Sequence, residues 1–233
     1  MKTLDTIDNI SLIENCLSHI GYELSKGNTS YFRIARESHL CLYRAMIEAL
    51  KGTANIAVTG KPSKKRVHIY SIGDDRFKEI HKIKINSCKR AWRFSEPVYI
   101  ETPPTFDQGD IKTDSEDYLI PFYDALAMVQ VECFMTQYIH SKPIRISDDE
   151  MKLLEWLHEA IRNDYEHFVP RLYAAPIDSL INVSFMCLKL TKDLLFGSGN
   201  VWIFKEERER AILQLIDSVT QKLTATMNRR KVG

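Results

Sequence analysis

Residues 10–28 read ISLIENCLSHIGYELSKGN, and their apolar pattern is that of an amphipathic helix. Aliphatic side chains recur every three or four positions: Ile10, Ile13, Leu17, Ile20 and Leu24. Because an α-helix has about 3.6 residues per turn, this spacing places them on one face, which a folded protein buries. The polar run Ser25–Asn28 ends the pattern, and we expect Gly27 to be the left-handed residue that caps the helix.

A second helix is predicted directly after this turn. Its apolar positions are Phe32, Ala35, Leu40, Tyr43, Ile47 and Leu50. The pattern stops at Lys51-Gly52, where glycine favours the end of a helix. Two amphipathic helices joined by a short turn pack as an antiparallel hairpin, so we expect residues 10–50 to form one.

The character of the sequence changes in residues 54–112. Short runs rich in β-branched residues alternate here with Gly, Pro and Asp: Ile56–Val58, Val67–Tyr70 and Ile83–Ile85. Such runs favour strands, and the residues between them favour turns. We therefore expect a small, partly extended insertion with about two short strands between the second and third helices.

Helical patterns resume after the insertion with two predicted capping boxes. The pairs are Thr113 with Glu116, and Ser147 with Glu150. In a capping box each side chain satisfies a backbone N–H of the other residue, so the motif marks the start of a helix. The first is expected to open a long helix that runs to about His140. The second is expected to open a helix that ends before Pro170, because proline cannot continue it.

Two further helices complete the pattern. One begins after Ala175-Pro176 and ends at Gly197-Ser198-Gly199. The other has a predicted apolar face of Ala211, Leu215, Val219 and Leu223. Residues 1–233 are thus predicted to form one domain of the all-α or mainly α class. It would be a bundle of about six helices, with residues 54–112 inserted.

The composition is that of an ordinary globular protein, since 44% of the 233 residues are hydrophobic and 27% are charged. No apolar run is long enough to cross a bilayer, so we expect no membrane partner. Residues 1–5 lack the apolar core of a secretory signal, so we do not expect one. The five cysteines are scattered, without Cys-x-x-Cys or zinc-ligand spacing. We therefore expect buried free thiols, a cytoplasmic location, and neither a metal nor a cofactor.

The net charge of +1 hides an uneven distribution. Residues 60–93 hold eleven Lys and Arg against three Asp and Glu, a local charge of +8, so the other residues together carry −7. A basic block in an otherwise acidic chain predicts a polyanionic partner. The residues expected to bind RNA are Lys61, Lys64, Lys65 and Arg66. Aromatic residues within the block favour a single strand whose bases can stack. The alternative is a solvated surface loop.

The candidate chemistry lies in residues 162–167, which read Arg-Asn-Asp-Tyr-Glu-His. A histidine can accept the proton of a ribose 2′-hydroxyl or deliver one to the leaving oxygen. An arginine can bind phosphate oxygens with its planar fork. On an ideal helix Arg162 and His167 lie about 140° apart, so they reach one pocket only if the helix ends there or a second copy contributes. Alternatively, they are exposed residues that complement the dipole at a helix end.

This string and the helical pattern around it resemble the HEPN domain (higher eukaryotes and prokaryotes nucleotide-binding). That superfamily is defined by an arginine, a following polar residue and a histidine a few residues further on. The resemblance covers about residues 114–223, less closely the first hairpin, and not the insertion. It implies a metal-independent endoribonuclease in which Arg162 and His167 are catalytic and Asn163 supports them.

The resemblance also implies partners. HEPN ribonucleases are usually homodimers whose motifs face a shared cleft, and they occur as toxins of toxin–antitoxin pairs, in phage defence and in RNA processing. An antitoxin or a small nucleotidyltransferase is thus an implied partner beside RNA. Some antitoxin-paired members carry a modifiable tyrosine where this chain has Val169, so we do not expect that regulation. The alternatives are a HEPN-like module that binds RNA or nucleotides without cutting, and a structural helical dimer or antitoxin-binding module.

Overall fold

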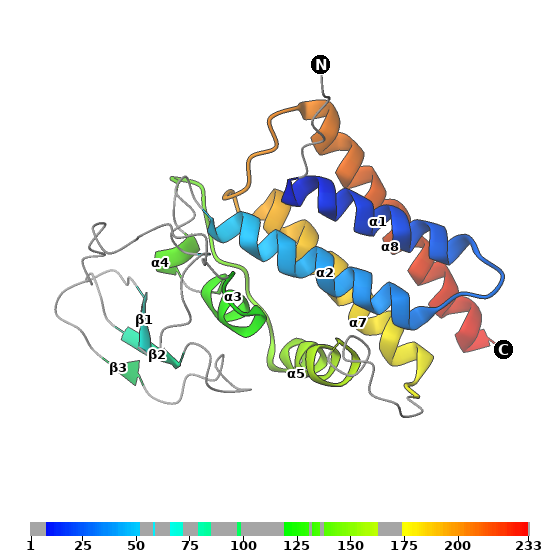
Figure 1. The fold of residues 1–233 in the computed structure, drawn as a ribbon, viewed down its shortest axis with the longest axis horizontal. Coiled ribbons are helices and arrows are strands. Elements are labelled where there is room, and N and C mark those ends of the chain that lie inside the picture. The colour runs from blue at the N-terminus through cyan, green and yellow to red at the C-terminus, as the bar shows by residue number, and fades with distance from the viewer. Residues whose placement is uncertain are drawn as a thin grey trace, which may run out of the picture. The chain divides into compact units, whose positions relative to one another are not determined.

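The structure is a computed structural model that describes residues 8–51, 58, 66–71, 79–84, 97–98, 119–130, 132–135, 138–162 and 174–232. In these residues the chain is mainly helical, with three short strands in the segment predicted to be the insertion (Figure 1). The predicted fold class is therefore confirmed. The chain groups into two compact units: Met1–Ala45, Ile146–Asp193 and Trp202–Gly233 form one, and Met46–Arg145 and Leu194–Val201 the other. That residues 1–233 form a single domain stays a prediction.

Helix α1 (Asn9–Ser25) begins at Asp8, whose side chain accepts a hydrogen bond from the backbone N–H of Ser11 at 2.6 Å. This bond satisfies a backbone donor that the first turn of a helix leaves unpaired. Four residues of the predicted apolar face are buried, with Cys16 beside them, and the fifth, Leu24, is half-buried: the buried four are Ile10, Ile13, Leu17 and Ile20. Burial of this face, more than helix propensity, stabilises a helix of this length.

Helix α2 (Tyr31–Leu50) runs antiparallel to α1. Arg44, late in α2, donates to the backbone carbonyl of Leu12 at 3.2 Å. His19, later in α1, lies 3.8 Å from the carboxylate of Glu37, which comes earlier in α2. The contacts advance along one helix as they recede along the other, so the predicted antiparallel hairpin is confirmed.

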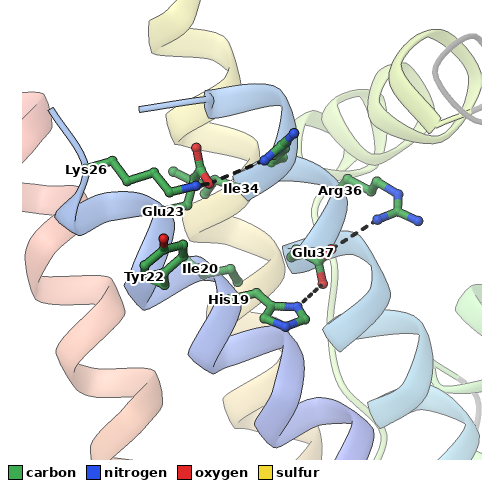
Figure 2. A pocket seen from close by; sticks show the side chains of 9 residues that line it. His19, Ile20, Tyr22, Glu23, Lys26, Ile34, Arg36 and Glu37 are labelled. Atoms are coloured by element: carbon green, nitrogen blue, oxygen red, sulfur yellow. Dashed lines mark hydrogen bonds and ion pairs between the residues drawn. The ribbon is translucent and has the colours of Figure 1, made fainter. Parts of the chain in front are cut away.

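The turn between the two helices differs from the prediction. Helix α1 ends at Ser25, and Lys26 is extended, with φ −78° and ψ 148°. Among the residues described, the glycine with a positive φ is Gly199, so Gly27 does not have the predicted left-handed conformation. Instead, the buried carboxylate of Glu23 accepts hydrogen bonds from Lys26 Nζ at 2.6 Å (Figure 2) and from the backbone N–H of Ser30 at 2.9 Å. One side chain thus links the end of α1 to the start of α2.

Helix α8 (Glu206–Val232) packs against α1 and against helix α7 (Ile177–Lys192). Its buried positions are Ile212, Ile216, Val219 and Leu223. The sequence prediction began this face at Ala211, which is exposed, and was wrong for that turn. A strict four-residue spacing drifts around the helix by about 40° per step, whereas alternating spacings of four and three stay on one face.

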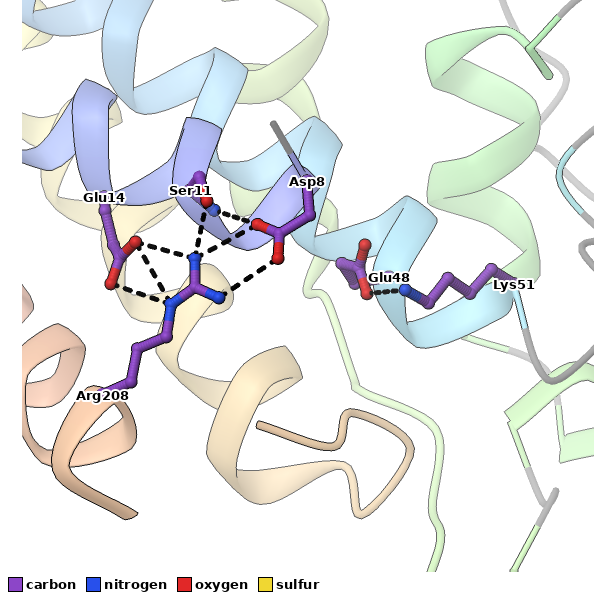
Figure 3. Close-up of polar contacts among 6 residues, drawn as sticks. All are labelled: Asp8, Ser11, Glu14, Glu48, Lys51 and Arg208. Atoms are coloured by element: carbon purple, nitrogen blue, oxygen red, sulfur yellow. Dashed lines mark hydrogen bonds and ion pairs between the residues drawn. The ribbon is translucent and has the colours of Figure 1, made fainter. Parts of the chain in front are cut away.

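Arg208 fastens the first turn of α8 to the start of α1 (Figure 3). Its guanidinium donates to both carboxylate oxygens of Asp8 at 3.1 Å, to Glu14 at 2.8 Å and to the Ser11 hydroxyl at 2.8 Å. These hydrogen bonds hold the pKa of Asp8 well below its usual range and raise the pKa of Arg208. Arginine suits hydrogen bonds to several side chains better than lysine does, because its planar guanidinium presents five N–H donors in fixed directions.

Helix α5 (Asp148–Trp156) begins with the predicted capping box. Glu150 accepts from the backbone N–H of Ser147 at 2.9 Å, and Ser147 Oγ accepts from the backbone N–H of Glu150 at 3.4 Å. Beyond Trp156 the helix continues in π geometry as η2 (Leu157–Arg162). Helix α7 likewise passes into a π segment, η3 (Asp193–Gly197), which ends at the predicted glycines.

The other unit contains the strands β1 (Arg66–Ser71), β2 (Glu79–Lys84) and β3 (Pro97–Val98). They form an antiparallel sheet in the order β1-β2-β3, with Arg66 opposite Lys84 and Ser71 opposite Glu79. Extended structure within residues 54–112 is thereby confirmed. In the same unit, the end of α2 carries an ion pair between Glu48 and Lys51 (Figure 3).

The long helix predicted from Thr113 to His140 is wrong where the structure describes it. Thr113 and Glu116 lie outside the described residues, and helix α3 (Phe122–Met128) begins only after Pro121. Proline lacks the N–H that a helix interior needs, so it interrupts the pattern here. Helix α4 (Glu132–Met135) follows, and residues 138–140 form a bend and turn.

Residues 198–200, which follow η3, form hydrogen bonds with residues 135–142 of the same unit. Lys142 donates its backbone N–H to the carbonyl of Ser198 at 2.9 Å, and Asn200 Nδ2 donates to the carbonyl of Met135 at 2.8 Å. Gly199 has φ 72°, and a Cβ there would lie 2.9 Å from the carbonyl oxygen of His140. Only glycine therefore fits this position without strain. No helix among the residues described is both long and apolar enough to cross a membrane.

Candidate functional site

The predicted catalytic motif follows directly on η2. Arg162 is the last residue of that segment, and its backbone is described, whereas Asn163 and His167 lie outside the described residues. Of the predicted RNA-binding residues, Lys61, Lys64 and Lys65 also lie outside them, and Arg66 is described by its backbone, as the first residue of β1. The side chains of the predicted site thus lie outside what the structure describes, and the site stays a prediction.

The backbone leading to the motif is unusual. Regular α geometry stops at Trp156, and the six residues Leu157–Arg162 are π-helical. A π turn is wider than an α turn because its hydrogen bonds join residues five apart, and such turns frequently occur at functional sites. The start of the segment is anchored, since Leu157 is fully buried. The motif thus begins where a regular, well-packed helix changes its geometry.

A pair of histidines connects η2 to α2. His158 Nδ1 lies 3.0 Å from His39 Nε2, and the two rings are 5.2 Å apart between centroids with a tilt of 33°. His39 is only 2% exposed. Arg162 follows His158 by four residues in the same segment, η2.

The sequence analysis did not find this pair. On a regular α-helix His158 would lie about 100° around the axis from the buried Leu157, yet it is half-buried. In π geometry consecutive residues are rotated by a smaller angle, so His158 stays closer to the buried side. The two histidines are 119 residues apart in the chain, so no local pattern signals their contact.

The histidine pair has definite proton requirements. A hydrogen bond between two imidazole nitrogens needs one ring to donate and the other to accept. At least one of the facing nitrogens must therefore be unprotonated, because two imidazolium rings would present two donors to each other. The pair fixes the orientation of both rings, and it couples the proton on His158 to that on His39.

The described cysteines are structural. Cys16, Cys41 and Cys187 are free and buried, which confirms that part of the prediction. Burial raises the pKa of Cys41 and that of Cys187. The thiolate, which is the nucleophile and metal ligand, is therefore disfavoured at both positions. In the described ranges no three His, Cys, Asp or Glu side chains gather closely enough to hold a metal ion.

Comparison of the chain with protein-family models, with curated proteins and with solved structures finds no match. The resemblance to HEPN domains therefore rests on the residue string 162–167 and on the helical pattern around it.

Proposed function

We propose that the protein is a metal-independent endoribonuclease. In this proposal Arg162 binds the scissile phosphate, His167 acts as general base or acid, and Asn163 supports the arginine or the phosphate. The observation that carries the proposal is the position of the motif. The string begins at Arg162, where a capped α-helix has passed into a π-helical segment held by the His39–His158 pair.

The π segment supports this proposal for a geometric reason. On a regular α-helix the side chains of Arg162 and His167 diverge by about 140°. The helix has already left α geometry before Arg162, which supports an arrangement other than that of a regular α-helix for the motif. Irregular helical turns are also a common way to aim functional side chains.

The proposed reaction is transesterification within the RNA. The base takes the proton of a ribose 2′-hydroxyl, and the 2′-oxygen attacks the adjacent phosphorus. The bond from phosphorus to the 5′-oxygen breaks, and the acid gives that oxygen a proton. The products are a 2′,3′-cyclic phosphate and a 5′-hydroxyl, so no water, metal or redox partner is consumed. The charge that builds on phosphorus is stabilised by Arg162.

This reaction predicts a clear product test. Wild-type protein should cut a single-stranded RNA oligonucleotide in excess EDTA, leave a 2′,3′-cyclic phosphate, and not cut a DNA oligonucleotide of the same sequence. Mass spectrometry of the fragments identifies the end group. Cleavage that stops in EDTA, or cleavage of the DNA, contradicts the proposal. Binding to RNA without cleavage would point instead to a binding module.

The proposal includes a homodimer, because base and acid act on opposite sides of the phosphate and the motif of each chain contains one histidine. Two copies whose motifs meet would supply both. We therefore predict that light scattering gives twice the chain mass of 27.0 kDa at micromolar concentration. A mass of one chain across that range would contradict it. A cytoplasmic role as a toxin or defence effector, with an antitoxin or nucleotidyltransferase as partner, belongs to the same proposal.

A further inference from the structure

A groove lies between the last turns of α1 and the first turns of α2 (Figure 2). Its volume is about 390 Å³, within the range of about 300–1,000 Å³ that small-molecule sites occupy. It is lined by an aromatic ring, Tyr22, by carboxylates of both helices and by cations that include Lys26 and Arg33. A groove of this size accommodates one nucleotide and not a duplex.

The groove carries a small excess of positive charge. Glu23 is ionised, because the hydrogen bond from Lys26 lowers its pKa, and Arg33 lies 3.9 Å from the same carboxylate. Glu37 pairs with Arg36 at 3.1 Å and with His19 at 3.8 Å. Three permanent cations thus face two carboxylates, before any proton on His19 is counted. The excess favours a ligand with a single negative charge.

Arg33 is the cation best placed to meet such a ligand. Its side chain is 61% exposed, and its distance of 3.9 Å from Glu23 is longer than a hydrogen bond. The guanidinium therefore keeps its planar set of donors for a phosphate, which it can bind through two nitrogens. Lys26, held by Glu23 at 2.6 Å, adds a fixed positive charge beside it.

Tyr22 adds a second kind of contact. The residue is 66% exposed, and Lys26 Nζ lies 4.5 Å from the centre of its ring. An exposed aromatic ring beside cations is the combination that binds single-stranded nucleic acid, since bases stack on the ring and phosphates meet the charge. A simple anion would gain nothing from the ring.

We propose that this groove binds one phosphorylated nucleotide, with its base stacked on Tyr22 and its phosphate bound by Arg33 and Lys26. That the nucleotide belongs to an RNA strand rests on the proposed function. The groove is then a substrate-binding site whose lining does not include Arg162, Asn163 or His167. A free nucleotide offers the same base and phosphate, so the experiment compares both sources.

The test uses the full chain and a fluorescent single-stranded oligonucleotide with 2′-O-methyl riboses, which cannot be cleaved by 2′-hydroxyl attack. Anisotropy titrations give Kd across a salt series. Tyr22→Ala should raise Kd by about fivefold to a hundredfold through lost stacking. Arg33→Ser should raise Kd and flatten the log-log salt slope by about 0.7 for one lost phosphate contact.

Arg210→Ser is the matched control. Arg210 is 69% exposed on α8 and pairs with one carboxylate, that of Glu206, at 3.4 Å. The Arg210→Ser variant should bind the oligonucleotide with the same Kd and salt slope as wild type. Competition with a nucleoside 5′-monophosphate distinguishes a free nucleotide from a strand. If the monophosphate displaces the oligonucleotide at equal nucleotide concentration, the groove binds free nucleotides. If it does not, the groove binds a strand. Unchanged Kd and salt slope in both groove variants would overturn the proposal.

The outcome is separable from that of the proposed function, because the oligonucleotide is never cut. If the groove variants lose binding but the wild type does not cleave RNA, the binding site is supported and the proposed ribonuclease activity is contradicted. If cleavage depends on His167 but Tyr22→Ala and Arg33→Ser bind as wild type does, the ribonuclease activity is supported and the binding site in the groove is contradicted.

Discussion

Helices α1 and α5 begin alike and end differently. Both start at a side-chain cap, Asp8 in one and the Ser147–Glu150 box in the other. Helix α1 then keeps α geometry to Ser25, and the charged side chain of Glu23 closes it. Helix α5 changes to π geometry after Trp156 and is tied to α2 by two histidines. One helix end is held by an ion pair between Glu23 and Lys26, and the other by a hydrogen bond between two imidazole rings.

This difference separates a structural end from a candidate functional one. Ion pairs and caps stabilise a helix over a wide range of pH, which suits a scaffold. Departures from local rules of helix formation are expected chiefly at functional sites, where the surrounding structure offsets their cost. We therefore look for chemistry at η2, and for stability at the contacts around α1.

Breaking the histidine pair is expected to have the largest effect on stability. His158→Ala should lower the free energy of unfolding by about 1–3 kcal/mol, because the buried His39 loses this hydrogen bond. The double variant His39→Leu, His158→Leu should cost less than the sum of the two single changes, since apolar groups need no partner. Urea denaturation compares five proteins: wild type, His158→Ala, the single variants His39→Leu and His158→Leu, and the double variant. Strictly additive costs would show that the pair is not an energetic unit.

Arg208→Ala tests the other side of the comparison. It removes hydrogen bonds to Asp8, Ser11 and Glu14 and should cost about 1–2 kcal/mol, since the guanidinium is partly exposed. Lys152→Ala is the control, because its pair with Asp149 lies on an exposed face and should contribute less than about 0.5 kcal/mol. Equal costs for the two variants would show that Arg208 is an ordinary surface contact.

The same variant should change the response to acid. The pKa of Asp8 is lower in the folded protein than its unfolded value of about 3.9, so its contribution is complete above that pH and is lost as the pH falls further. Wild type should therefore lose more stability than Arg208→Ala below about pH 4. Thermal midpoints recorded from pH 6 down to pH 3 measure the difference, and parallel curves for the two proteins would contradict the assignment.

Local patterns predicted local structure well. The apolar face of α1 and the capping box of α5 follow from spacings of three and four residues, which the helix itself imposes. The prediction failed at Pro121, where helical spacing was read through a residue that interrupts a helix. It also failed for Gly27, because the Glu23 side chain closes that turn.

The candidate site was less accessible to sequence reasoning. The string from Arg162 to His167 suggested a chemistry, but no residue pattern signalled the π geometry that precedes it. The contact of His39 with His158 joins two helices across 119 residues, and the groove at Tyr22 and Arg33 depends on how α1 and α2 pack. Such features become visible only in three dimensions.

Cleavage of a single-stranded RNA by His167→Ala and Arg162→Ala, beside wild type, tests the central claim most directly. His140→Ala, which changes an exposed histidine outside residues 162–167, is the control. Loss of a general acid–base typically lowers a rate by about a hundredfold to ten-thousandfold. We predict such a loss for His167→Ala, a comparable one for Arg162→Ala, unchanged circular dichroism in both, and wild-type activity in the control. Wild-type cleavage by either motif variant would contradict the account.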